Sequence, residues 1–125
     1  MKEIKFRVYD SDRKKMRYLD TNHDFICFDE KGSGYYHNMQ TGLGEWFSDL
    51  MQYTGLNDRV GTPIYEGDIL REYSNDICDW VVSYSYGKFI GTYDNVDEDL
   101  YELSDFDVIG NIYENKEEKI NNGKI

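Results

Sequence analysis

The residues best suited to chemistry are the carboxylates between positions 94 and 107, in a stretch that has no lysine or arginine from position 89 to position 115. The acids of this run are Asp94, Asp97, Glu98, Asp99, Glu102, Asp105 and Asp107. A calcium loop needs oxygen ligands at alternate positions and a glycine at its sharp turn. Counted from Asp94 the third position is Val96, and counted from Asp97 the fifth is Tyr101. No glycine follows in place, so the run does not match an EF-hand.

Three interpretations of this acidic run stay open. It is an adventitious site for a divalent ion, a solvated loop, or a surface that meets a basic partner or mimics phosphate. The candidate residues for a partner surface are Asp94, Asp97, Glu98, Asp99 and Glu102.

Residue types that bind zinc or act as nucleophiles are present without the spacing that either chemistry needs. His23 and Cys27 are four residues apart, whereas His37 and Cys78 are distant and no Cys-x-x-Cys occurs. We expect both cysteines to be reduced and buried. The chain has no Gly-x-Ser-x-Gly, and Gly61 is followed by Thr-Pro instead of the Lys-Thr of a phosphate-binding loop. We therefore expect no enzyme, no metal and no cofactor.

The charge balance limits the partners of the chain. The 125 residues contain 25 acids and 14 bases, which gives a net charge of −11. Such a chain repels nucleic-acid backbones and anionic membranes, so we expect neither direct nucleic-acid binding nor membrane binding. The excess suits a basic protein partner or a protein that imitates the charge of DNA, and the simplest interpretation is solubility alone.

The tightest cluster of turn signals lies in residues 50–70. Glycine permits a positive φ, and Pro63 fixes its own φ and favours an extended residue before it. We predict one turn at residues 55–61 and a second at residues 66–68, where the aspartate can accept backbone N–H groups. An apolar pair, then acid-Gly-Asp, then another apolar pair is typical of small SH3-like barrels. The predicted structural residues of these turns are Gly55, Pro63, Glu66, Gly67 and Asp68.

The rest of the pattern predicts an all-β fold. Residues 4–8 alternate as a half-buried strand does, and 16–19 return after a turn whose lysines and arginines we interpret as a solvated hairpin tip. We predict a strand at residues 25–28. Residues 80–84 and 88–93 are predicted to form a hairpin around Tyr86-Gly87. Residues 106–113 are predicted to contain a last strand that bends at Gly110. Residues 35–45 have partly helical spacing, and 46–54 fit a strand or one to two helical turns.

Four segments carry a resemblance to a known family: KEIKFRVYD near the N-terminus, LMQYTGL and PIYEGDIL in the middle, and VIGNIYEN at 108–115. In this order, over residues 2–115, the chain resembles the YopX family, small proteins encoded by phages and prophages of Gram-positive bacteria. The resemblance favours a strand from about residue 49 and implies a bacterial host. It implies no particular reaction.

Together these observations predict a small SH3-like barrel core with an extra N-terminal hairpin and an irregular or short-helical insertion within residues 20–45. We expect one domain over 1–115, a polar tail over 116–125 and a cytoplasmic location in the bacterial host. The expected function is that of a non-enzymatic phage or prophage accessory protein that contacts a host or phage protein. Self-association through open sheet edges is also expected. The alternative is an acidic inhibitor or DNA mimic directed at a host DNA-binding protein.

Overall fold

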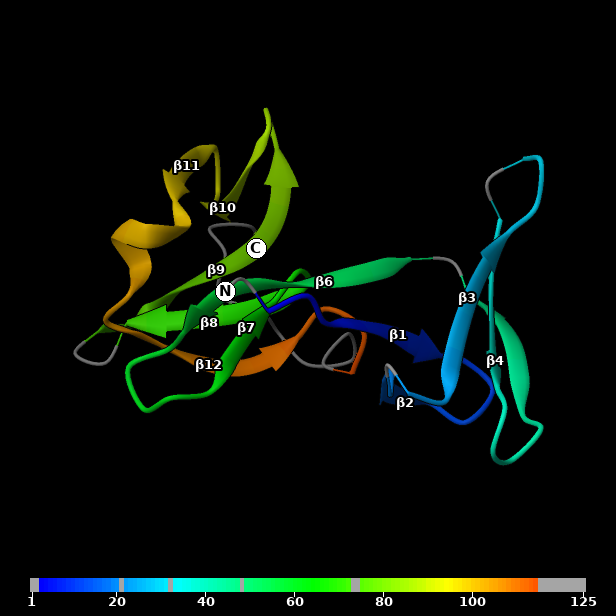
Figure 1. Cartoon of the computed structure of the whole chain (residues 1–125). Helices are drawn as coiled ribbons and strands as arrows, with labels where there is room; N and C mark the ends of the chain where they lie inside the picture. Colours follow the sequence, from blue (N-terminus) through cyan, green and yellow to red (C-terminus); the bar gives the residue numbers. More distant parts are fainter. Residues whose placement is uncertain (1–2, 21, 32, 48, 73–74, 115–125) are drawn as a thin grey trace. The chain divides into compact units, whose positions relative to one another are not determined.

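A computed structural model of the chain describes residues 3–20, 22–31, 33–47, 49–72 and 75–114 (Figure 1). The described secondary structure is almost entirely β, which confirms the predicted class. The chain divides into two compact units, one over residues 3–52 and one from residue 53 onward, with the boundary inside strand β6 (Leu50–Asn57). The single domain predicted over 1–115 stays a prediction, and the tail predicted over 116–125 lies outside the described residues.

The first unit begins with the predicted hairpin of β1 (Phe6–Asp10) and β2 (Lys15–Tyr18). Its turn is stabilised by Asp10, whose Oδ1 accepts the backbone N–H groups of Asp12 at 3.1 Å and Arg13 at 3.0 Å. The first half of β6 pairs antiparallel with β1, from Phe6 opposite Gln52 to Val8 opposite Leu50. The half-buried alternation predicted for β1 is wrong at Arg7, which is 2% exposed and donates to the Tyr18 hydroxyl.

Three further strands of this unit form a separate sheet in the order β3-β4-β5, with bounds Asp24–Phe28, Gly34–Asn38 and Gly44–Phe47. Its inner face contributes Tyr36 and Phe47 to a core that also contains Val8. The predicted irregular or short-helical insertion is therefore wrong at the strands β4 and β5. Of the two alternatives for 46–54, the strand is confirmed at the residues that belong to β5 and β6. Two glycines of this sheet have a packing role, because a Cβ at Gly34 would overlap the Phe47 ring and a Cβ at Gly44 would overlap the Tyr35 side chain.

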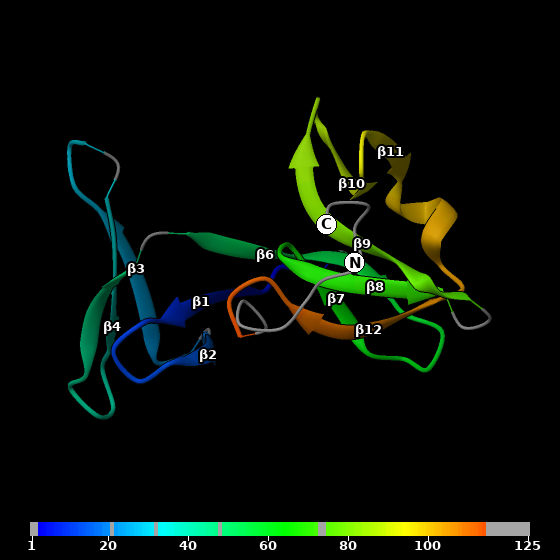
Figure 2. The same cartoon turned by 180° about the vertical axis from the view of Figure 1, so that it is seen from behind.

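The second unit is built on a five-stranded sheet in the order β11-β10-β9-β8-β12, which curls into a half-barrel (Figures 1 and 2). The strands are β8 (Asp68–Glu72), β9 (Asn75–Ser85), β10 (Lys88–Tyr93), β11 (Val96–Asp99) and β12 (Phe106–Asn111). The short β7 (Pro63–Tyr65) pairs with the end of β6. The SH3-like closure of the barrel stays a prediction.

A short 3₁₀-helix, η1 (Leu100–Leu103), contributes to the core of this unit. Leu100 and Leu103 are buried with Ile64, Leu70 and Val82. Burying a leucine side chain contributes about 1.5–3 kcal/mol, so η1 adds substantially to a small core. Its approach to β10 depends on Gly91, where a Cβ would overlap the Leu103 side chain.

The predicted turns of this unit are largely confirmed. Tyr86 and Gly87 both have positive φ, 55° and 79°, as the two-residue hairpin between β9 and β10 requires. The predicted bend in the last strand is a register shift between Val108 and Gly110. The first central turn lies later than predicted, because β6 continues through Asn57.

The second central turn is formed by Glu66-Gly67-Asp68, as predicted. Gly67 has φ +87°, its N–H donates to the Val82 carbonyl at 2.8 Å, and its own carbonyl accepts the Ile112 N–H at 2.9 Å. Asp68 Oδ2 accepts the Tyr65 N–H at 2.8 Å. This turn therefore connects β7 and β8 to two other parts of the unit.

Replacing Gly67 with valine should lower the free energy of unfolding by about 1–3 kcal/mol, because a β-branched residue is strained at positive φ. Urea unfolding followed by tryptophan fluorescence measures the change. Gly67→Asn is the matched control, since asparagine tolerates this conformation better than other non-glycine residues, and it should cost clearly less. Equal stability of the valine variant and the native chain would contradict this account of the turn.

Candidate functional site

The acidic run lies at one edge of the five-stranded sheet. Asp97, Glu98 and Asp99 are in β11, whose four residues are all exposed and which pairs with β10. Asp94 lies in the turn between these strands with φ 56°, and Glu102 is exposed on η1. Three of the five candidate carboxylates are therefore on a paired strand instead of in a loop, and all five are exposed.

Two carboxylates of β11 have partners on β10. Asp97 Oδ1 accepts the Thr92 hydroxyl at 2.7 Å, and Asp99 Oδ1 lies 2.6 Å from Lys88 Nζ. Both groups of the Lys88–Asp99 pair are more than half exposed, so their interaction is weak in water. Lys88 neutralises one of the three strand carboxylates, and the edge remains strongly negative.

Two exposed tyrosines, Tyr86 and Tyr101, lie near this acidic edge. Tyr86 is 92% exposed at the β9–β10 turn and lines a cleft of about 220 Å³ together with Asp97, Glu98 and Asp99. Tyr101 is 73% exposed on η1, next to Glu102. Both tyrosine side chains are therefore available to a partner.

The zinc-type and thiol residues do not converge. No group of three or more His, Cys, Asp or Glu with the geometry of a metal site occurs within the described ranges. His23 Nδ1 lies 2.7 Å from Asp20 Oδ2, whose pKa is lowered mainly by that contact. Both cysteines are free thiols, as expected, but Cys27 is exposed and Cys78 half-buried, so the predicted burial is wrong. Cys27 lies near the end of β3, an edge strand of the three-stranded sheet, where an apolar run does not ensure burial, and Cys78 lies within β9.

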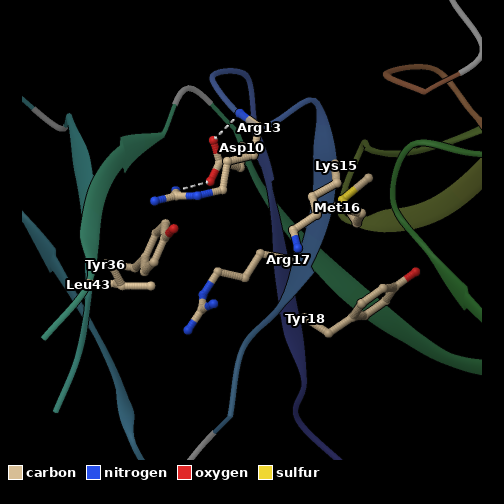
Figure 3. Close-up of a pocket in the computed structure, with 8 residues that line it drawn as sticks. All are labelled: Asp10, Arg13, Lys15, Met16, Arg17, Tyr18, Tyr36 and Leu43. Carbon is tan, nitrogen blue, oxygen red and sulfur yellow. Dashed lines mark hydrogen bonds and ion pairs between the residues drawn. The ribbon is translucent and has the colours of Figure 1, made fainter. Parts of the chain in front are cut away.

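A pocket of about 370 Å³ in the first unit was not predicted (Figure 3). The basic segment that we interpreted as a solvated hairpin tip forms one wall. Because successive side chains of a strand alternate between its two faces, Lys15 and Arg17 of the edge strand β2 lie on the same face of the hairpin. Tyr36 belongs to β4. The lining residues are Asp10, Arg13, Lys15, Met16, Arg17, Tyr18, Tyr36 and Leu43.

Arg17 is held in this pocket by two contacts. Its Nη2 donates to Asp24 Oδ1 at 2.8 Å, and its guanidinium carbon lies 4.8 Å from the centre of the Tyr36 ring. Asp24 in turn accepts the Asp20 N–H at 2.6 Å and the Asn38 side-chain amide at 2.8 Å. A planar guanidinium held on an aromatic face and by a carboxylate has little freedom left to lose.

The acids of the pocket are covered. The Asp10 side chain is 4% exposed and lies 2.7 Å from the Arg13 guanidinium, and the Asp24 side chain is 1% exposed. Burial alone would raise the pKa of both carboxyls, but backbone N–H groups and the neighbouring arginines outweigh it and lower both pKa values. Burial raises the pKa of the Tyr36 hydroxyl. The carboxylates are therefore ionised at neutral pH and mostly hidden from solvent.

These features define a small all-β protein of two compact units, one with an acidic sheet edge and one with a basic pocket. The chain belongs to the YopX family, because the family model described as YopX protein matches residues 5–118. No described helix is long and apolar enough to cross a membrane.

Two solved structures are similar to this chain. Protein EF1440 from Enterococcus faecalis is 28% identical, with a TM-score of 0.63 over 94% of this chain and 98% of that one. Protein yopX from Bacillus subtilis is 21% identical, with a TM-score of 0.63 over 90% of this chain and 95% of that one. The second likeness shows the fold alone. No curated protein matches this chain.

Replacing Asp24 with asparagine should lower the free energy of unfolding at pH 7 by about 1–3 kcal/mol, because Arg17 then loses its charged acceptor. The pKa of Asp24 is lowered in the folded state, so its contribution is present above the unfolded-state value of about 3.9 and is lost as pH falls towards the folded value. Urea unfolding at pH 7 and at pH 3 measures both effects. The difference between variant and native chain should shrink at pH 3, and an equal difference at both pH values would contradict this role.

Proposed function

We propose that this chain is a non-enzymatic interaction module of a phage or prophage, and that it binds a basic protein partner through the acidic edge formed by β11 and η1. The observation that carries the proposal is the exposure of the whole of β11, in which three successive residues are carboxylates. Within residues 89–114 no lysine or arginine opposes them. The chain belongs to the YopX family, and the phage context is what the resemblance to that family implies.

The acidic edge has the parts that a protein interface needs. Its charge attracts a basic surface from a distance, and such steering raises association rates and favours oppositely charged partners. Tyr86 and Tyr101 add rigid area with both apolar and hydrogen-bonding character, of the kind enriched in interface centres. An edge strand can also accept a strand of another chain, so the same edge supports pairing with a host protein, a phage protein or a second copy.

A second candidate function is imitation of DNA, directed at a host DNA-binding protein. A β-strand rises about 3.4 Å per residue, which equals the spacing of charges along one DNA strand, about 3.4 Å. Asp97, Glu98 and Asp99 therefore place one carboxylate at each such step. Successive side chains of a strand point to opposite faces, so only Asp97 and Asp99 share a face, and this weakens the match.

Substituting all three strand carboxylates, Asp97→Asn, Glu98→Gln and Asp99→Asn, should abolish partner capture and leave the fold intact, because the residues are exposed. Capture from nuclease-treated host lysate is read by mass spectrometry at low and at high salt. Raising the salt from 0.1 M to 1 M shortens the screening length from about 10 Å to about 3 Å, so a mimic should release its partner. A packed interface should retain it.

The matched control removes the same charge from the other unit. The substitutions Glu3→Gln, Asp12→Asn and Glu30→Gln change three exposed acids, and partner capture should be unaffected. Equal capture by the native chain and by the β11 variant would contradict the acidic edge as the binding surface. Equal loss in both variants would show that net charge alone attracts the protein.

A further inference from the structure

The pocket of the first unit has a charge opposite to that of the chain. Four of the 14 lysines and arginines of the chain lie at positions 13, 14, 15 and 17, and three of these line the pocket. The cations face solvent: Lys15 is exposed, and the Arg13 and Arg17 side chains are 44% and 27% exposed. The carboxylates that balance the two arginines are almost fully covered. The surface that a ligand meets is therefore positive, although the chain carries −11.

Hydrogen-bond donors remain available in this pocket. A guanidinium carries five N–H donors, and the hydrogen bond of Arg17 with Asp24 occupies only its Nη2. Its Nε is buried without an acceptor among the residues that the structure describes. Lys15 has no partner among them either. The two residues are i and i+2 on one face of β2, about 7 Å apart along the strand, so one tetrahedral or planar anion can bridge them.

The size and the walls of the pocket indicate more than a bare ion. A volume of about 370 Å³ is equivalent to about twelve water molecules at ~30 Å³ each. It falls in the range of small-molecule pockets, about 300–1,000 Å³. On the wall opposite β2 (Figure 3), Leu43 supplies an exposed aliphatic side chain, whereas Tyr36 is 2% exposed and lies behind the Arg17 guanidinium. An apolar body attached to the anion would have surface to contact.

We propose that this pocket binds a small organic anion. Its phosphate or carboxylate group lies between Lys15 and Arg17, and its ring or aliphatic body lies against Leu43. Because Asp24 and Tyr36 already hold Arg17, binding orders little beyond Lys15, and preorganisation of this kind favours affinity. The half-buried Glu45 pairs opposite Tyr36 on β5 and acts electrostatically on Arg13, so it opposes the anion.

The probe is phenyl phosphate, titrated into the ¹⁵N-labelled full chain and followed by NMR chemical shifts. Phenol and inorganic phosphate test the two halves of the ligand, and benzoate distinguishes a carboxylate from a phosphate. We expect shifts at Arg17 and Tyr36 and weaker binding of phenol and of inorganic phosphate than of phenyl phosphate. Lys15→Gln should weaken phenyl phosphate binding about tenfold, as expected for the loss of one charge-assisted hydrogen bond. Glu45→Gln should strengthen it.

Lys14→Gln is the matched control, because Lys14 is exposed, adjacent to Lys15 and outside the pocket lining. It removes the same charge and should leave binding unchanged. Equal weakening by Lys14→Gln and Lys15→Gln would overturn the proposal, since it would indicate diffuse attraction instead of a site. Absence of shifts at about 10 mM phenyl phosphate would also overturn it. If inorganic phosphate bound as tightly as phenyl phosphate, the proposal that the ligand has an organic body in contact with the pocket would be overturned.

Discussion

The structure depends most on one requirement: a carboxylate that is removed from water must be hydrogen-bonded. Among the residues that the structure describes, five aspartates are buried, and in each unit one of them connects distant parts of the sequence. In the second unit, Asp58 accepts the N–H groups of Val60 and Thr62 with one oxygen and that of Val108, fifty residues away, with the other. In the first unit, Asp24 connects Arg17, Asp20 and Asn38 in the same way. Part of the acidity therefore builds the fold.

The remaining charges are distributed differently in the two units. In the second unit, exposed acids gather on β11 and η1, at one edge of the five-stranded sheet. In the first unit, the two acids that pair with Arg13 and Arg17 are covered, and the bases of β2 and its turn face solvent. The net charge of −11 does not describe either surface, because it sums the charges of surfaces that differ in sign. Protein contact at one surface and anion binding at the other are therefore compatible in one small chain.

Close packing at glycines is a second constraint on this fold. Gly34 and Gly44 let the rings of Phe47 and Tyr35 approach neighbouring strands, and Gly91 lets Leu103 close over β10. In a sequence, a glycine signals a turn or a break in a helix. At these positions it marks the absence of a side chain that would otherwise occupy the space of another residue. A turn glycine can be told from a packing glycine only when the residue opposite it is known. The sequence does not give that residue, and this is why strands β4 and β5 were not predicted.

The sequence by itself determined the all-β class, the two hairpins, the bend at Gly110 and the turn at Glu66-Gly67-Asp68. Each of these depends on alternation or on turn residues a few positions apart, so local patterns contain the information. Only the tertiary structure decided the three-stranded sheet, the buried aspartates and the basic pocket. These depend on contacts between distant residues, such as Arg17 with Asp24 and Tyr36, and no local period encodes which side chains will meet.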